Sequence, residues 1–443
     1  MSINIHNGTS FNEVSKVNIV PPYSYLSAYK NVKRVWVHNG TKYVMVKGRL
    51  LEVVWEVDMS TWSGVTWGNG YASNNKSKGM TIDSSGNLIN LVDYALGDSK
   101  TYSGRYPIQL INASNGSISC WTSSGSTYYP YKQWTTVSGE THYEEPVCMC
   151  RCGDYVAFIT FFGMVYLYNI SGGRKDSYEN ESWHIEGTSA YIGSGGILID
   201  YTNNCIYFPI STGTFDYDWT HMYRMGVYNG NLYNPVIHFG YTQSNSTSYS
   251  LISFVTDRET SKLVLSLQKY DKTNSNRSYS LEVYSTSYSY SSGTTNVGVL
   301  CSITTRYEEA PIYAKGGYVY TYNGDGIKKY RISDMSLVWQ VSERHWFNGG
   351  SMEVCPSGVR CEDYGDSAFI MPNGAIVYFD GTIDRPNEWF SASGITAGVF
   401  NESLGIGYAQ LYYSDVSYTD GNPIYNTNGL AVNKILKLKE VKK

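Results

Sequence analysis

The stretch GMTIDSSGNLINLVDY, residues 79–94, decides the fold class. Alternating apolar residues flank Asp-Ser-Ser-Gly-Asn (83–87) and predict a strand, a tight turn and a second strand, because Gly and Asn adopt the backbone angles that turns need. The segment YPIQLINASNGSISCW (106–121) follows with a similar pattern and ends on Trp121. Near the C-terminal end, GGYVYTYNGDGIKKYRISDMSLVWQV (316–341) repeats the order and closes on Trp339. Short antiparallel strands therefore recur along the chain.

The composition indicates an all-β protein. The 443 residues include 43 tyrosines and 43 glycines, and only 16% are charged, against about 25% in ordinary soluble proteins. Tyr, Thr, Val and Ile suit a pleated sheet, whereas Gly, Asn, Asp and Ser suit the turns between strands. Disordered chains show the opposite balance, with few aromatic residues and many charges.

Charge and hydropathy exclude several classes of partner. The net charge is −4 and the only basic cluster is the tail KILKLKEVKK, so we expect no nucleic-acid partner. The longest apolar stretch, near 155–168, is too short for a membrane-spanning helix and alternates like strands, so we expect no membrane insertion. The start MSINIHNG lacks a signal-peptide pattern, which predicts synthesis in a cytoplasm without export by the general route.

Units of about 40–55 residues, each a run of short strands, are typical of propeller blades. A four-stranded blade cannot bury both its faces alone, but blades packed face to face around an axis bury them for one another. The units resemble divergent β-propeller repeats through Asp83–Asn87, Asn112–Trp121 and Asp334–Trp339. The resemblance implies about seven blades, with six or eight as alternatives, over residues 58–443, and strand-final tryptophans that fill the wedge between neighbours. A stacked pair of β-sandwiches is the main rival.

Two copies of a short hairpin precede this body, in residues 1–57. The matching positions are Ile3, Ile5, His6, Asn7, Gly8, Thr9, Phe11 and Val14 in the first copy, and Val35, Val37, His38, Asn39, Gly40, Thr41, Tyr43 and Val46 in the second. Asn-Gly between β-prone runs predicts a two-residue turn, which would place His6 opposite Thr9, Asn4 opposite Phe11, His38 opposite Thr41 and Trp36 opposite Tyr43. An isolated two-stranded ribbon is not stable in water when both of its faces are apolar and exposed. We therefore expect the hairpins to be covered by the main body or by another subunit.

The second copy, VWVHNGTKYVMV (35–46), is similar to hairpins that recur near the termini of virion proteins of tailed bacteriophages; residues 3–14 match the same pattern with Asn4 in place of Trp. The resemblance implies a structural protein of the particle, a tail component such as a nozzle, tip or fibre-associated protein. It also implies docking through the hairpins, other virion proteins as partners, a homo-oligomer or ring, and location in the virion. Trp36 belongs to the same docking set.

No cofactor and no enzymatic activity are expected. The seven histidines are scattered, and the chain has no HExxH, GxSxG or GxxxxGK[ST] motif. The first alternative is a host-surface glycan-binding module, for which Trp219, Trp346 and Trp389 are the candidate contacts. Carboxylates occur in small groups, Glu144 with Glu145, Asp216 with Asp218, and Glu362 with Asp363 and Asp366, so a polysaccharide-degrading glycosidase is the second alternative.

Two further segments carry specific expectations. In CMCRC, every second residue is a cysteine: Cys148, Cys150 and Cys152. This spacing places all three on one face of a strand, where they cannot easily surround a tetrahedral metal ion. We therefore expect them to act as small buried hydrophobic residues and not as metal ligands. The segment 278–297 alternates Tyr and Ser almost strictly, which predicts a strand with one tyrosine face. That face would contact either a partner or sugar, or a neighbouring blade.

Overall fold

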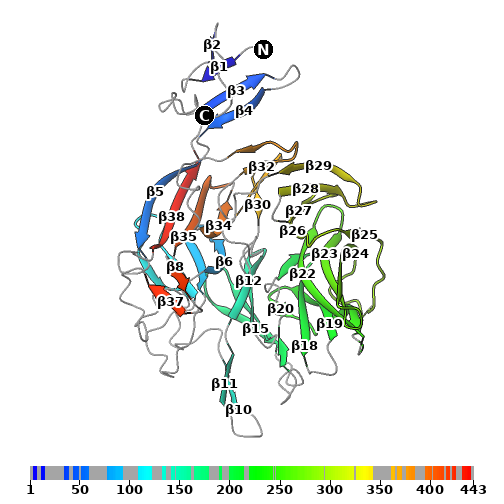
Figure 1. The fold of residues 1–443 in the computed structure, drawn as a ribbon. Coiled ribbons are helices and arrows are strands. Elements are labelled where there is room, and N and C mark those ends of the chain that lie inside the picture. The colour runs from blue at the N-terminus through cyan, green and yellow to red at the C-terminus, as the bar shows by residue number, and fades with distance from the viewer. Residues whose placement is uncertain are drawn as a thin grey trace. The chain divides into compact units, whose positions relative to one another are not determined.

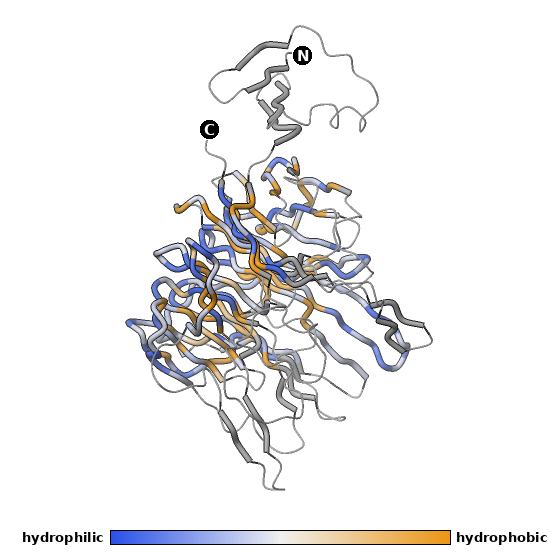
Figure 2. The backbone as a smooth tube through the Cα atoms, turned by 90° about the vertical axis from the view of Figure 1, so that its left-hand side faces the viewer, coloured by the Kyte–Doolittle hydropathy of each residue, from blue (hydrophilic) through white to orange (hydrophobic). Residues whose placement is uncertain are grey.

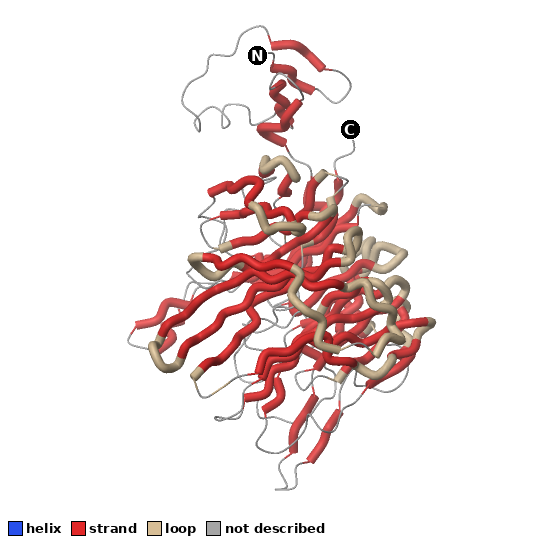
Figure 3. Tube along the Cα trace, turned by 90° about the vertical axis from the view of Figure 1, so that its right-hand side faces the viewer, coloured by secondary structure: helices blue, strands red, loops and turns tan. Residues whose placement is uncertain are grey.

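The structure is a computed structural model of the whole chain. It describes residues 3–6, 11–14, 34–38, 43–48, 51–58, 77–92, 108–121, 132–135, 141–144, 146–160, 164–178, 189–191, 199–213, 219–242, 244, 246–293, 295–323, 326–342, 361–364, 367–371, 376–384, 395–401, 403–413, 416–419, 422–425 and 432–440. Strands, turns and loops make up all of these residues, without a helix among them (Figure 3). Accordingly, the described ranges hold no helix long and apolar enough to cross a membrane.

The chain divides into two compact units, Ser60–Arg360 and the combination of Met1–Met59 with Cys361–Lys443. Over its described residues, the first unit contains five sheets of four or more antiparallel strands, coloured from light blue to yellow in Figure 1. Their strands are β6 (Ser77–Ile82), β7 (Leu88–Val92), β8 (Ile108–Ile111) and β9 (Ile118–Cys120); β12 (Pro146–Cys152), β13 (Tyr155–Thr160), β14 (Val165–Asn169) and β15 (Arg174–Tyr178); β16 (Ser189–Tyr191), β17 (Asp200–Thr202), β18 (Cys205–Gly213), β19 (Trp219–Tyr228), β20 (Asn231–Leu232) and β21 (Val236–Thr242); β22 (Thr247–Asp257), β23 (Lys262–Asp271), β24 (Asn276–Ser285) and β25 (Cys301–Thr305); and β26 (Ala310–Lys315), β27 (Tyr318–Tyr322), β28 (Gly326–Arg331) and β29 (Leu337–Ser342). A two-stranded hairpin, β10 (Lys132–Thr135) with β11 (Thr141–Glu144), lies between the first two sheets in the sequence.

The five sheets pack face to face in chain order. Clusters of buried side chains join the β6–β9 sheet to β12–β15, that sheet to β16–β21, the latter to β22–β25, and β22–β25 to β26–β29. Strand β13 shows how the sequence produces this arrangement. Val156 and Phe158 belong to the cluster with β6–β9, whereas Ala157 and Ile159 belong to the cluster with the β16–β21 sheet. Because side chains alternate between faces along a strand, an uninterrupted apolar run buries both faces, and in Figure 2 the hydrophobic stretches follow these strands.

The other unit contains three sheets. The first has the order β2-β1-β3-β4, from β1 (Ile3–His6), β2 (Phe11–Val14), β3 (Arg34–His38) and β4 (Tyr43–Gly48). The second has β30 (Glu362–Asp363), β31 (Ala368–Ile370), β32 (Ile376–Tyr378) and β33 (Ile383–Asp384). The third has the order β34-β35-β38-β5, from β34 (Ile395–Asn401), β35 (Ile406–Tyr413), β38 (Val432–Glu440) and β5 (Leu51–Asp58). A further hairpin pairs β36 (Val416–Thr419) with β37 (Asn422–Tyr425).

The last sheet combines both ends of the chain. Strand β5 pairs with β38 along Lys434↔Asp58 to Glu440↔Leu51, and Lys434 Nζ donates to Glu56 Oε1 at 2.7 Å. The sheet therefore takes its outer strand from a segment that precedes every other strand of the body. All of strand β5 except Asp58 falls within residues 1–57, and its pairing places it with the C-terminal sheet, not with the hairpins.

Consecutive antiparallel sheets with neighbours on both faces are the arrangement of propeller blades, and the fold is the all-β propeller that the sequence predicts. Besides the N-terminal sheet, seven sheets of four or more antiparallel strands occur over the described ranges, five in one unit and two in the other. A pair of sandwiches would give each sheet one packed face, whereas the β12–β15 sheet has two. The predicted turn at 83–87 is present, where Asp83 Oδ1 accepts hydrogen bonds from the backbone N–H groups of Ser85 at 2.9 Å and Asn87 at 2.8 Å.

The two closing tryptophans behave differently. Trp121 is buried, and its ring centroid lies 5.7 Å from Phe158 and 5.5 Å from Tyr168, both in the next sheet. Its Nε1 also donates to the carbonyl oxygen of Ile170 at 3.2 Å. This confirms the predicted filling of the wedge between neighbouring blades. Trp339 is half-buried, and its ring lies 5.8 Å from Tyr320 of its own sheet.

Candidate functional site

The two N-terminal hairpins pair with each other. Strands β1 and β3 run antiparallel with the register Ile3↔Val37, Asn4↔Trp36 and Ile5↔Val35. Asn4 and Trp36 hold equivalent positions in the two repeats, so the copies meet as they would across a twofold axis. The pairing turns two ribbons into one four-stranded sheet, which supplies the strands that an isolated hairpin lacks.

The predicted register within each hairpin is wrong. His6 pairs with Phe11 and not with Thr9, and Asn4 pairs with Glu13 and not with Phe11. In the second copy His38 pairs with Tyr43 and Trp36 with Met45, across a register shift between Val35 and Trp36. The innermost pairs are His6↔Phe11 and His38↔Tyr43, with four residues between the two members of each pair. The two-residue turn that Asn-Gly favours would leave only two. The loop residues Asn7, Gly8, Thr9, Asn39, Gly40 and Thr41 lie outside the described residues.

Most of the other candidate residues also fall outside the described ranges. Trp346, Trp389, Glu145, Asp216, Asp218 and Asp366 belong to this group. Trp219 begins β19, Glu144 ends β11 and Glu362 begins β30, but their side chains lie outside the description. Asp363 is exposed. Across the part of the chain that is described, no three His, Cys, Asp or Glu side chains gather as metal ligands.

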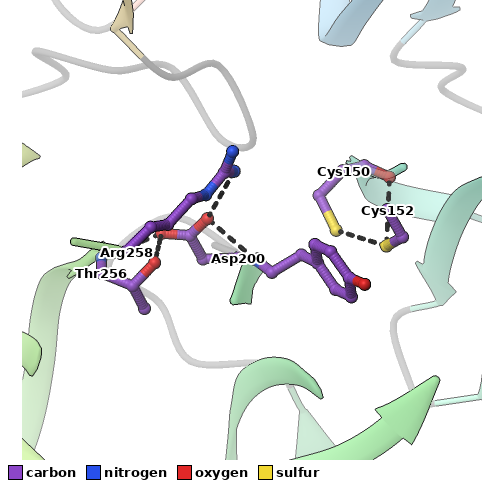
Figure 4. Close-up of polar contacts among 6 residues, drawn as sticks. Cys150, Cys152, Asp200, Thr256 and Arg258 are labelled. Carbon is purple, nitrogen blue, oxygen red and sulfur yellow. Dashed lines mark hydrogen bonds and ion pairs between the residues drawn. The ribbon is translucent and has the colours of Figure 1, made fainter. Parts of the chain in front are cut away.

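The cysteine triplet lies on one face of β12, as predicted. Cys148, Cys150 and Cys152 pack against the aliphatic cluster shared with the β16–β21 sheet, while Met149 faces the opposite cluster. Cys150 Sγ and Cys152 Sγ are 3.6 Å apart (Figure 4). Burial raises the pKa of the Cys150 thiol, and its contact with Cys152 raises it further. A raised pKa keeps the thiol protonated, which suits packing and not nucleophilic chemistry.

Carboxylates join neighbouring sheets at their hairpin turns. Asp200 Oδ2 accepts hydrogen bonds from Thr256 N at 3.0 Å and Thr256 Oγ1 at 2.9 Å, and Arg258 Nη2 lies 4.0 Å from Oδ1 (Figure 4). Asp257 is buried, and its carboxylate accepts from Glu259 N, from Thr260 Oγ1 at 2.7 Å and from Gly317 N at 2.6 Å in the following sheet. These acidic groups join neighbouring blades, because each accepts at least one hydrogen bond from the sheet that follows its own.

A polar centre is buried between the β16–β21 sheet and the segment that follows β24. Arg224 is among the largest fully buried side chains, pairs across the ladder with Tyr207, and lies 4.9 Å from the Tyr288 ring centroid. Its Nη2 donates to the carbonyl oxygen of Ser292 at 2.6 Å. His238 Nε2 lies 2.8 Å from the carbonyl oxygen of Ser285, and burial lowers the pKa of His238 to about 4. The imidazole is therefore neutral at pH 7 and donates through Nε2.

The Tyr/Ser segment is a strand only in its first part. Strand β24 ends at Ser285, and the following residues form a loop that returns over the preceding sheet. We call residues 286–293 and 295–300 the strap. Val297 N donates to His238 O at 2.7 Å, and Tyr290 stacks on Tyr228 with centroids 4.7 Å apart and planes 6° apart. The strand predicted through residue 297 is wrong beyond Ser285, because the strap bonds to β21 instead of extending its own sheet.

Sequence reasoning missed the exposed tyrosines that this loop creates. Tyr228 and Tyr233 are 42% and 38% exposed, and Tyr233 lies 5.0 Å from Tyr290 by ring centroids. The motif YNGNLYN (228–234) carries an Asn-Gly turn between the first two tyrosines. That signal could have located one half of the cluster, although not the strap that completes it.

Comparison with known proteins yields similar solved structures. The chain resembles the Dos1 propeller (9% identity over 88% of this chain and 95% of that one, TM-score 0.40), BamB from Moraxella catarrhalis (11%, 88% and 99%, TM-score 0.37) and the C-terminal WD40 domain of Sif2 (9%, 89% and 99%, TM-score 0.38). No family model and no curated protein matches the chain. These similarities carry no functional inference.

Proposed function

We propose that the chain is a structural protein of a tailed-bacteriophage particle, a tail component docked through its N-terminal sheet. The observation that carries the proposal is the pairing of the two HNGT hairpins into a sheet of their own, β2-β1-β3-β4. The same hairpins carry the resemblance to virion proteins. The propeller is then the body that the sheet fastens to the particle.

The arrangement of the sheet suggests how docking works. Within the described strands, β2 and β4 are the outer members and pair on one side only. An outer strand presents backbone N–H and C=O groups to which another chain can add a strand. Because the repeats are related as if by a twofold axis, each contributes one outer strand. Two outer strands favour contact with two neighbours, as in a homo-oligomer or ring of virion proteins.

Incorporation into particles tests the proposal. Strand β1 pairs on both sides, so a proline at Asn4 removes an N–H from one of its two ladders. Asn4→Ala keeps that N–H and is the matched control. Gradient-purified particles from hosts that supply each full-length variant would be immunoblotted for the chain relative to capsid protein. Full-length variants are needed because deletion of residues 1–57 would also remove β5 from the C-terminal sheet.

We expect wild type and Asn4→Ala to be incorporated equally, and Asn4→Pro to be incorporated at least about tenfold less. An equal urea midpoint for the two variants would show that the propeller is unaffected. Normal incorporation of Asn4→Pro, or absence of the wild-type chain from particles, would overturn the proposal. No described pair of carboxylates favours the glycosidase alternative.

A further inference from the structure

Three tyrosines form an aromatic surface beside the end of β19. Tyr228 and Tyr233 are 42% and 38% exposed, and Tyr290 of the strap lies against both. One face of Tyr228 is covered by the parallel ring of Tyr290, so its exposed area lies on the other face and the ring edge. Exposed rings gathered in one place on a soluble protein are typical of binding surfaces.

The rings are fixed in place before any ligand arrives. A Cβ added at Gly226 would lie 2.7 Å from Tyr290 Cβ, so the strap approaches β19 as closely as a glycine allows. On the N-terminal side of Tyr290, Asn203 Nδ2 donates to the carbonyl oxygen of Thr286 at 2.8 Å. On the C-terminal side, Arg224 Nη2 donates to the carbonyl oxygen of Ser292. A preformed surface loses less conformational entropy on binding than a flexible loop does.

The two segments that carry the rings contain amide and hydroxyl side chains and no charged side chain. Asn229, Asn231 and Asn234 are exposed, and Ser289 and Ser291 flank Tyr290 in the strap. Neither 226–236 nor 286–298 contains Asp, Glu, Lys or Arg. Asn supplies both a donor and an acceptor, and Ser supplies a hydroxyl that can do either. Such groups match the hydroxyls of a sugar, while the rings match its apolar C–H face.

We propose that Tyr228, Tyr233 and Tyr290, with Asn229 and Asn231, form a binding platform for a neutral glycan. A pyranose ring stacks on the open face of Tyr228 or Tyr233, and the asparagine amides bond its hydroxyls. The two segments that carry the rings contribute no basic side chain, and Arg224 beneath the strap is buried. This argues against nucleic acid and against acidic sugars, which need accessible basic side chains. The platform is independent of the N-terminal docking sheet. It also differs from the set Trp219, Trp346 and Trp389 that the sequence suggests.

A glycan array tests the platform. Full-length chain would be applied to a printed array of neutral hexose and N-acetylhexosamine oligosaccharides together with their sialylated and sulfated counterparts. The strongest neutral binder would then be titrated by calorimetry against wild type, Tyr228→Ala, Tyr233→Ala and Tyr228→Phe. Tyr307→Ala is the matched control, because Tyr307 is also exposed, at 52%, and follows β25 of another sheet.

We expect Tyr228→Ala or Tyr233→Ala to weaken binding by about tenfold or more, the loss typical of removing one aromatic stacking partner. Tyr228→Phe keeps the ring and should stay within about threefold of wild type, and Tyr307→Ala should bind like wild type. The proposal would be overturned if no neutral glycan bound, if only acidic glycans bound, or if both alanine variants at the platform bound as wild type does. The incorporation of the chain into particles is a separate readout, so failure of one proposal is distinguishable from failure of the other.

Discussion

Phe158→Ala should be among the most damaging single substitutions in the propeller. Phe158 is fully buried on β13, and its ring lies 5.7 Å from Trp121 and 5.8 Å from Tyr168. Truncation removes its buried ring from the wedge between two blades and leaves a cavity, which costs about 3–5 kcal/mol for a phenylalanine in a well-packed core. The two aromatic contacts place the expected loss toward the upper end of that range.

Urea unfolding of the full chain, followed by tryptophan fluorescence, would measure the effect. Trp121 makes the signal sensitive to this interface, because it packs directly on Phe158. Leu337→Ala is the control, since Leu337 is 52% exposed and its truncation should change the free energy of unfolding by less than about 0.5 kcal/mol. A loss below about 1 kcal/mol for Phe158→Ala would refute the face-to-face packing of the β6–β9 and β12–β15 sheets.

Three further outcomes follow from described contacts. Asn4 and Glu13 are directly opposed, so the double variant Asn4→Cys, Glu13→Cys should form a disulfide under mild oxidation, and Asn4→Cys, Phe11→Cys should not. Mass spectrometry of peptides would detect the crosslink, and a disulfide in the second variant alone would contradict this register. His238 is buried with its pKa lowered to about 4, whereas an unfolded histidine has a pKa of about 6.5. The unfolded state therefore binds a proton that the folded state does not, so stability should fall by about 3 kcal/mol as the pH drops from about 6.5 to about 4, and urea midpoints of His238→Gln should fall less over this window. Asp257→Ala should cost about 3 kcal/mol in the same assay because it removes a buried carboxylate that accepts three hydrogen bonds, and a change within error would show that Asp257 does not join the two turns.

The sequence predicted those elements that depend on residues close together in the chain. The turn at Asp83–Asn87 followed from residue types that favour turn geometry, and the strands near 155–168 followed from their apolar pattern. The propeller class followed because such strands recur and no single sheet could bury its own faces. Trp121 was predicted correctly for the same reason.

Pairings between distant segments were not predictable in this way. Strand β5 joins β38 across more than 370 residues, as the Lys434–Glu56 bond shows, and neither segment's pattern specifies its partner. The Asn-Gly signal predicted a two-residue turn, but the hairpins also pair with each other through β1 and β3. The tyrosine platform likewise joins a turn after β19 to a strap after β24, two segments that share no local pattern.

A cryo-EM reconstruction of an intact particle that carries this chain would test the central claim most directly. We expect the four-stranded N-terminal sheet to be in contact with neighbouring virion subunits, with strands added at β2 or β4 and the propeller outside that contact. A reconstruction in which the sheet faces solvent on every side, or in which the propeller alone contacts the particle, would contradict the account.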